Sequence, residues 1–198
     1  MQNSNAMQDY VINLLKEKIS PYYYYHNYRH TLYVQEKAIE IGIAEGCNAA
    51  EIEWLSVAAL WHDTGFIHTY LHHEQAGCIL VREQLPGFGY TKNSIDIICG
   101  MIMATKIPQS PQTRLEEILA DADLEYLGTA GVEEKAALLY KELQHLQPSL
   151  TPAHWHQMQI NFLQTHQYFT PFCKQQRAPA KQAELERLLT LETGNATS

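Results

Sequence analysis

The segment Ala58-Ala59-Leu60-Trp61-His62-Asp63-Thr64-Gly65 places an adjacent histidine and aspartate at the end of an apolar helical pattern. Helical spacing puts Leu55, Ala59 and His62 on one stripe, which should face the protein core. Burying a carboxylate without a partner costs several kcal/mol, even after the surroundings relax. The segment therefore predicts a helical fold with a polar site inside it, and that site needs a partner.

Two further polar side chains stand on apolar helical stripes. His30 lies one turn before Val34, and Asp123 lies one turn after Leu119. A single histidine on such a stripe is more often a hydrogen-bonded core residue than a ligand. Inward-facing groups from three separate helices, together with the histidine–aspartate pair, favour a shared divalent metal ion. Two imidazoles and two carboxylates suit Mn²⁺, Fe²⁺, Ni²⁺ or Zn²⁺, and the absence of thiolates argues against a closed structural zinc site.

The composition is that of a globular protein. The chain has 198 residues, of which 45% are hydrophobic and 18% charged, enough for one domain with a real core. The formal net charge is −8, and no basic run is present. Binding to nucleic acid is disfavoured because it depends on neutralising phosphates with lysine and arginine. The negative net charge does not exclude a small anionic substrate, since a bound metal ion supplies local positive charge.

Cysteine usage and hydropathy point to the cytoplasm. The four cysteines stand far apart without a C-x-x-C pair, so we expect reduced thiols. No apolar stretch approaches the roughly 18–20 residues that a membrane span needs, and the polar start lacks the apolar centre of a signal peptide. Ser4-Asn5-Ala6 resembles a cloning remnant before a native Met7. We therefore expect residues 1–7 to be disordered or tag-derived.

The hydrophobic period is helical nearly throughout, and no alternating strand pattern of useful length occurs. Helix start signals are Asn48, Thr113 and the pair Thr151-Pro152. We predict an all-α single domain over residues 1–198 with about eight to nine helices. Their expected ranges are 9–19, a long helix ending near 46, 48–65, 74–85, 93–106, 114–127, 132–146, 152–168 and 174–190.

Three segments resemble, in wording and in order, the motifs of the HD superfamily of metal-dependent phosphohydrolases. Tyr25-His26-Asn27-Tyr28-Arg29-His30-Thr31 is similar to the first-ligand segment of that family. Leu60-Trp61-His62-Asp63-Thr64-Gly65 is similar to its central motif, and Leu119-Ala120-Asp121-Ala122-Asp123-Leu124 to its last-ligand helix. Residues 103–109 and 166–170 resemble a group of uncharacterised predicted HD phosphohydrolases. The resemblance implies an HD-domain helical bundle with its core at about 22–130 and C-terminal helices, 131–190, packed on it.

The resemblance also implies the ligands and the reaction. Carried over by position, the metal ligands are His30, His62, Asp63 and Asp123. They would hold one divalent ion, with Mn, Fe, Ni, Co, Zn and Mg all open. The expected activity is hydrolysis of a small phosphate ester by a metal-activated water, as a phosphomonoesterase or a phosphodiesterase. A nucleotide is one candidate substrate.

Further residues are assigned roles around this centre. Asp63 is expected both to bind the ion and to orient the water. Glu74 would act as general base or water-positioner, and His73 would contact phosphate or protonate the leaving group. Arg29 and Lys106 are candidate phosphate contacts. Simpler interpretations stay open: Glu74 as a first-turn acid, Lys106 as a cation at a helix end, and Arg29 as a solvated surface residue.

Departures from the family pattern narrow the alternatives. The segment Ile98–Ala104 lacks the extra histidine of two-metal members, so a second ion would need His68, His72 or His73. That gap also argues against a di-iron HD oxygenase, which we keep as a lesser alternative. Hydrolases of the nucleotide ppGpp and of cyclic dinucleotides are disfavoured because their acidic pair and Gly-Tyr-Pro segment are absent. A non-catalytic nucleotide- or metal-binding HD module is the main alternative. A homodimer is compatible with the sequence.

Overall fold

The computed structural model describes residues 2–195, and over these residues it contains helices and connecting loops but no strand. This confirms the all-α prediction. The α-helices are α1 (Gln2–Lys18), α2 (Tyr28–Ala44), α3 (Ala49–Trp61), α4 (His73–Gln84), α5 (Lys92–Ala104), α6 (Arg114–Leu124), α7 (Val132–Leu146), α8 (Pro152–Thr165), α9 (Pro171–Gln176) and α10 (Ala178–Asn195). Three short 3₁₀ helices are η1 (Thr64–Ile67), η2 (Leu85–Phe88) and η3 (Glu125–Gly128).

Side-chain caps fix the starts of the helices, as the sequence predicted. Asn48 accepts hydrogen bonds from Ala50 N and Glu51 N, and the Glu51 carboxylate accepts one from Asn48 N, which completes a capping box. Thr113 caps α6, and Thr151 caps α8 with Pro152 at its first position. These caps satisfy backbone donors that have no partner within the helix.

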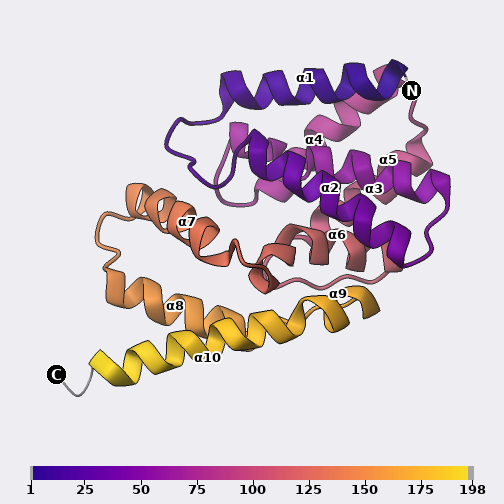
Figure 1. Cartoon of the computed structure of the whole chain (residues 1–198). Coiled ribbons are helices and arrows are strands. Elements are labelled where there is room, and N and C mark those ends of the chain that lie inside the picture. Colours follow the sequence, from indigo (N-terminus) through magenta and orange to yellow (C-terminus); the bar gives the residue numbers. More distant parts are fainter. Residues whose placement is uncertain (1, 196–198) are drawn as a thin grey trace.

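Helix α3 runs through the main hydrophobic core, which is formed with α1, α2, α4, α5 and α6 (Figure 1). Its residues from Val57 to Trp61 are all buried, so this part of the helix is enclosed on every side. The Trp61 indole N–H group donates to the Met7 sulfur, with 3.4 Å between nitrogen and sulfur. The carboxyl end of α3, where the histidine–aspartate pair follows, is therefore held rigidly within the protein.

The amino-terminal segment differs from the expectation for residues 1–7. Helix α1 begins at Gln2, and the Met7 side chain is only 2% exposed. Met7 takes part in the main core, so the last residue of the expected disordered range is a core position. The polar residues before Met7 predicted disorder. In the structure the helix forms because the buried Met7 side chain packs in the core and stabilises it. Met1 lies outside the described residues.

A second hydrophobic cluster joins the C-terminal helices to the rest of the chain. Tyr25, from the loop before α2, and Leu127, from η3, pack there with residues of α7, α8 and α10. Helices α8 and α10 lie side by side in Figure 1, below the end of α6. The C-terminal helices therefore form a separate wall facing the ends of α2 and α6.

The described residues form ten α-helices rather than eight or nine. The expected helix 174–190 is divided into α9 and α10 at Arg177. Pro179 cannot donate a backbone hydrogen bond into a continuous helix, and the Arg177 guanidinium forms an ion pair with the buried Glu125. Over the described residues, the hydropathy of every helix is too low, or its length too short, for a transmembrane segment.

Candidate metal centre

His30, His62 and Asp123 meet at one point although they come from α2, the end of α3 and α6. Each offers one ligand atom, and these atoms all lie within 4.8 Å of one another. His30 Nε2 is 3.0 Å from Asp123 Oδ1. The prediction that these inward-facing residues converge is therefore confirmed.

Asp63 joins the same group because the helix ends between it and Trp61. The backbone at His62 is still helical, whereas Asp63 has φ −99° and ψ 4°, outside the helix. On a straight helix the two adjacent side chains would point about 100° apart. Here Asp63 Oδ2 lies 3.1 Å from His62 Nε2 and 3.5 Å from His30 Nε2.

Gly65 maintains this geometry by allowing two elements to approach each other. A Cβ atom added at Gly65 would lie 1.8 Å from the carbonyl oxygen of His73 and 2.7 Å from Gly77 N. The interpretation of Gly65 as the end of the helix 48–65 was incomplete, because α3 has already ended at Trp61 and Gly65 lies within η1. Its role is to bring η1 against the first turn of α4 and so place His73 beside Asp63.

The hydrogen bonds and the burial of these residues indicate that the centre is suited to bind a cation. His62 Nδ1 donates to the Ala59 carbonyl at 2.7 Å, which leaves Nε2, on the side of the carboxylates, as the ring atom that would bind an ion. His62 Nε2 and Asp63 Oδ2 are buried and have no hydrogen-bond partner among the described residues. Unsatisfied buried polar atoms cost about 1–3 kcal/mol each, and a shared divalent ion would satisfy both. The group can therefore hold a metal ion.

The charges within the group determine where its proton resides when no ion is bound. Burial disfavours the charged imidazole of His62, but Asp63 and Asp123 outweigh it and raise the pKa of His62 well above its usual value. Burial dominates at His30 and lowers its pKa despite the hydrogen bond to Asp123. Burial would raise the pKa values of Asp63 and Asp123, yet the histidines hold both below the ordinary range. When no ion is bound, the two carboxylates therefore favour protonation of His62 over protonation of His30.

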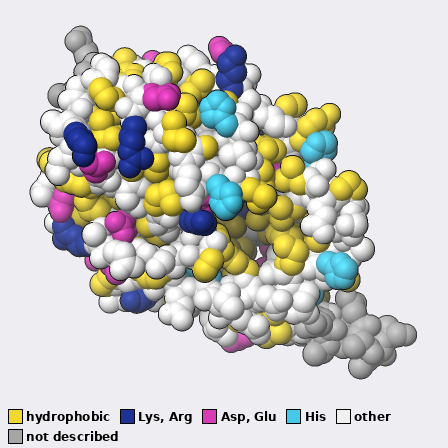
Figure 2. All heavy atoms as spheres, turned by 180° about the vertical axis from the view of Figure 1, so that it is seen from behind, with side chains coloured by type: hydrophobic (Ala, Val, Ile, Leu, Met, Phe, Trp, Pro, Cys, Tyr) yellow, Lys and Arg dark blue, Asp and Glu magenta, His cyan; other side chains and the backbone are white. Residues whose placement is uncertain are grey.

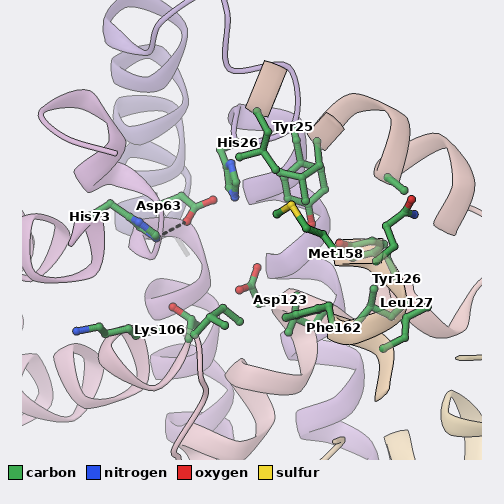
Figure 3. A pocket seen from close by; sticks show the side chains of 18 of the residues that line it. Tyr25, His26, Asp63, His73, Lys106, Asp123, Tyr126, Leu127, Met158 and Phe162 are labelled. Carbon is green, nitrogen blue, oxygen red and sulfur yellow. Dashed lines mark ion pairs between the residues drawn. The ribbon is translucent and has the colours of Figure 1, made fainter. Parts of the chain in front are cut away.

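His73 and Glu74 extend the centre from the start of α4. His73 Nε2 lies 3.6 Å from Asp63 Oδ1 and 3.7 Å from Glu74 Oε1, and Figure 3 shows the first of these pairs. The His73 ring stacks on Phe66 with the ring centres 3.8 Å apart. Glu74 is buried. Both residues therefore lie beside the candidate metal centre, and their expected catalytic roles stay predictions.

The other loop histidines do not extend the site. His68 and His72 are exposed. His72 has a left-handed backbone with φ 60° just before α4. Among the described side chains, His30, His62 and Asp123 form the one group whose ligand atoms all lie within 4.8 Å of one another, and Asp63 lies against two of these residues.

The two expected phosphate contacts have different positions. Lys106 lines the cavity beside the centre, with its side chain extending away from Asp123 in Figure 3. Arg29 is exposed, its Nε donates to the Tyr28 hydroxyl at 3.2 Å, and it does not line the cavity. The expected phosphate contact is therefore corrected for Arg29, because His30 takes the inward direction and its neighbour on the helix faces solvent.

A second histidine–carboxylate pair lies beside the centre and was missed by the sequence analysis. His26 Nδ1 is 2.5 Å from Glu142 Oε1, and Glu142 Oε2 accepts hydrogen bonds from the backbone N–H groups of Tyr25 and His26. His26 lines the same cavity (Figure 3). Burial would lower the pKa of His26, but Glu142 outweighs it and raises that pKa. The only signal in the sequence was an acidic residue within the apolar pattern of α7.

Asp121 fixes a loop and does not support a ligand histidine. It accepts hydrogen bonds from Phe169 N at 2.9 Å, from Thr170 N at 2.8 Å and from the Thr170 hydroxyl at 2.6 Å. Two residues apart along α6, Asp121 and Asp123 face different sides of the helix. Asp121 therefore holds the loop before α9, and Asp123 faces the centre.

The centre opens into a cavity of about 830 Å³. Asp63, His73, Glu74 and Asp123 line one end of it. Figure 3 shows Tyr126, Leu127, Met158 and Phe162 on the opposite side. The size lies within the roughly 300–1,000 Å³ typical of small-molecule sites.

Comparison with known proteins agrees with the motifs. A family model for the HD domain matches residues 27–125, which is half of the chain and contains all four expected ligands. The chain therefore belongs to the HD-domain family, the superfamily of metal-dependent phosphohydrolases that its motifs resemble. Its fold is similar to that of a predicted HD superfamily hydrolase from an uncultured Thermotogales bacterium, with 22% identity and a TM-score of 0.54. That match covers 79% of this chain and 88% of the other. No curated protein matches the chain.

Proposed function

We propose that this protein is a metal-dependent phosphohydrolase that acts on a small phosphate ester. The observation that carries the proposal is the convergence of His30, His62, Asp63 and Asp123 at the end of a cavity of ligand size. When bound there, a divalent cation supplies an activated water and positive charge that stabilises the phosphoryl oxygens.

The residues of α4 would handle the protons. Glu74 is buried at the first turn of the helix and would accept a proton from the attacking water or orient it. His73 is held between Asp63 and Glu74 by its stacking on Phe66. It would donate a proton to the leaving oxygen or contact the phosphate. His73 Nε2 is 3.6 Å from Asp63 and 3.7 Å from Glu74, which is longer than a hydrogen bond. Catalytic hydrogen bonds are often long without substrate and shorten when it binds, so these distances are compatible with both roles.

Two cationic or proton-bearing groups would hold the phosphate. His26 uses Nδ1 for Glu142, so its Nε2 is the ring atom left to contact the substrate. Lys106 lines the same cavity and has a side chain long enough to reorient toward an anion. Neither assignment needs Arg29.

The test is a screen of small phosphate esters with Mn²⁺, Ni²⁺ or Co²⁺, using the purified full chain. We expect metal-dependent release of phosphate by the wild type and loss of at least about a hundredfold in Asp63→Ala, which removes a ligand. Asp96→Ala is the control, because Asp96 is exposed and pairs with the exposed Arg82 and Lys92 on α4 and α5.

Three outcomes would contradict the proposal. Equal activity of the wild type and Asp63→Ala would exclude the assigned centre. Binding of metal and phosphate without turnover would indicate the non-catalytic HD module. Oxygen uptake without release of phosphate would indicate the oxygenase.

A further inference from the structure

The cavity beside the metal centre is polar at one end and apolar over most of its remaining wall. Many of these apolar side chains come from η3, α7 and α8. Apart from Glu125 at the start of η3, these helices follow residues 27–125, which match the HD domain. The apolar side chains include Leu127, Leu139, Leu143, Trp155, Met158 and Phe162. Figure 2 shows hydrophobic side chains gathered around a hollow on this face. The C-terminal helices thus add an apolar compartment to the centre that the family motifs define.

The apolar side chains that line the cavity are not fully buried by packing within the protein. Met158 is 46% exposed, and Leu139, Trp155 and Phe162 are only partly buried. Apolar surface in contact with water is unfavourable by about 25 cal/mol per Å² relative to its burial. An apolar ligand that covered these side chains would gain this energy.

The charges that line the cavity match a single phosphate group. Lys106 is the only lysine or arginine that lines it among the described residues. The acidic groups are Asp63, Glu74, Asp123 and Glu184, the last of which is paired with Arg187. A nucleoside polyphosphate would bring several negative charges, whereas the partners assigned to the phosphate here are one metal ion, Lys106 and His26. The polar end of the cavity can therefore neutralise a single phosphate group.

The polar groups that α8 adds to the cavity lining are few, namely Gln159, Asn161 and Thr165, and the last two are already hydrogen-bonded in part within the helix. The Thr165 hydroxyl already donates to the carbonyls of Asn161 and Phe162, at 2.9 and 3.2 Å. The Asn161 side-chain oxygen already accepts from Gln157 at 3.0 Å. A site that selects a base needs free hydrogen-bonding groups aimed at its edge. The apolar wall instead fits a hydrocarbon.

We propose that the substrate is a phosphate monoester of an apolar alcohol. This inference rests on the proposed phosphohydrolase function. The phosphate binds at the metal centre, and the hydrocarbon lies against α7 and α8. A water oxygen bonds to phosphorus, the bond from phosphorus to the alcohol oxygen breaks, and that oxygen takes a proton. The products are inorganic phosphate and the free alcohol.

The test compares n-alkyl phosphates from ethyl to octyl on the Mn²⁺-loaded full chain. We expect kcat/KM to rise roughly three- to fourfold for each added methylene until the chain fills the cavity. Met158→Gln should lower the ratio of octyl to ethyl phosphate hydrolysis by about tenfold. Leu146→Gln is the matched control, because Leu146 is 42% exposed on α7 and does not line the cavity.

Binding is measured separately, by calorimetry with ethyl- and octylphosphonate, which are not hydrolysed. Tighter binding of octylphosphonate, weakened in Met158→Gln and not in Leu146→Gln, supports the apolar site. If octylphosphonate binds in this way but no ester is hydrolysed, the phosphohydrolase function fails and the apolar site stands. If esters are hydrolysed with an octyl-to-ethyl ratio near one, or if AMP is the better substrate, the inference is overturned and the function stands.

Discussion

His26 Nδ1 lies 2.5 Å from Glu142 Oε1, across 116 residues of sequence. Glu142 also accepts hydrogen bonds from the backbone N–H groups of Tyr25 and His26, so α7 holds the segment that leads into α2. Both His26 and Glu142 lie outside residues 27–125, which match the HD domain. The C-terminal helices therefore position a residue beside the centre whose ligands all come from the family core.

We expect Glu142→Gln to destabilise the protein by about 2 kcal/mol, because it removes a charged hydrogen bond to a side chain that is largely buried. The size of this loss should depend on pH. Burial would raise the pKa of Glu142, but His26 holds it below 4.5, so its contribution is lost as pH falls through the folded-state value. Burial would lower the pKa of His26, but Glu142 raises it above 6.5, so its contribution is fully present below 6.5 and is lost as pH rises through the folded-state value.

The difference between wild type and Glu142→Gln should therefore be largest between about pH 4.5 and 6.5. Urea unfolding of both proteins across about pH 4–9 measures it. Glu134→Gln, on the same helix and exposed, should change the free energy of unfolding by less than about 0.5 kcal/mol. A difference that is constant with pH would show that the pair carries no charge.

Asp121→Asn should separate structural from metal-binding roles on α6. Phe169 N and Thr170 N donate to different oxygens of Asp121, so the asparagine N–H₂ group would face one of these two donors without accepting from it, and we expect a loss of stability of about 2 kcal/mol. Metal affinity should be unchanged, because Asp121 faces away from Asp123. Thermal unfolding and metal titration together check this, and a weakened metal affinity at full stability would contradict it.

Gly65→Ala should affect both stability and activity. The new Cβ would overlap the His73 carbonyl oxygen, so η1 and α4 must move apart at a cost of about 3 kcal/mol or more. His73 and Glu74 would shift relative to Asp63, and kcat should fall more than metal affinity. Gly87→Ala is the control, because a Cβ added at Gly87 would meet open space and Gly87 does not line the cavity. Equal stability of the two variants would refute this role for Gly65.

Metal binding should release a proton. In the metal-free protein, burial opposes protonation of His62, but its neighbouring carboxylates raise its pKa well above 6.5. An ion must displace that proton, so the apparent affinity should increase as pH rises through and above neutrality. Calorimetry at about pH 7 in buffers of different ionisation enthalpy should report release of about one proton. No release at this pH would mean that His62 is neutral before the ion binds.

Much of the centre could be predicted from the sequence because helical periodicity gives the direction of a side chain. His30, His62 and Asp123 each continue an apolar stripe, and each faces inward in the structure. Asp63 required the additional argument that a helix end frees its backbone, and its dihedral angles agree. The same periodicity could have excluded Arg29, which directly precedes the inward His30 on α2 and faces solvent.

Helical periodicity could not predict which distant segments of the chain contribute residues to the site. His26 lies in a loop, where no period applies, and its partner Glu142 is on a helix far along the chain. The break at Arg177 had a local signal in Pro179, but the ion pair between Arg177 and Glu125 could not be read from the sequence. The apolar cavity likewise arises from how α7 and α8 face the centre, and hydrophobic residues alone do not distinguish a cavity wall from a packed core.

The central claim is that His30, His62, Asp63 and Asp123 bind one divalent ion jointly. Equilibrium dialysis against Mn²⁺ tests it most directly, with Asp123→Ala as the ligand variant and Asp121→Asn as the control on the same helix. We predict one equivalent of Mn²⁺ on the wild type and on Asp121→Asn, and an affinity weakened by about a hundredfold or more in Asp123→Ala. Undiminished binding by Asp123→Ala, or no binding by the wild type, would contradict the account.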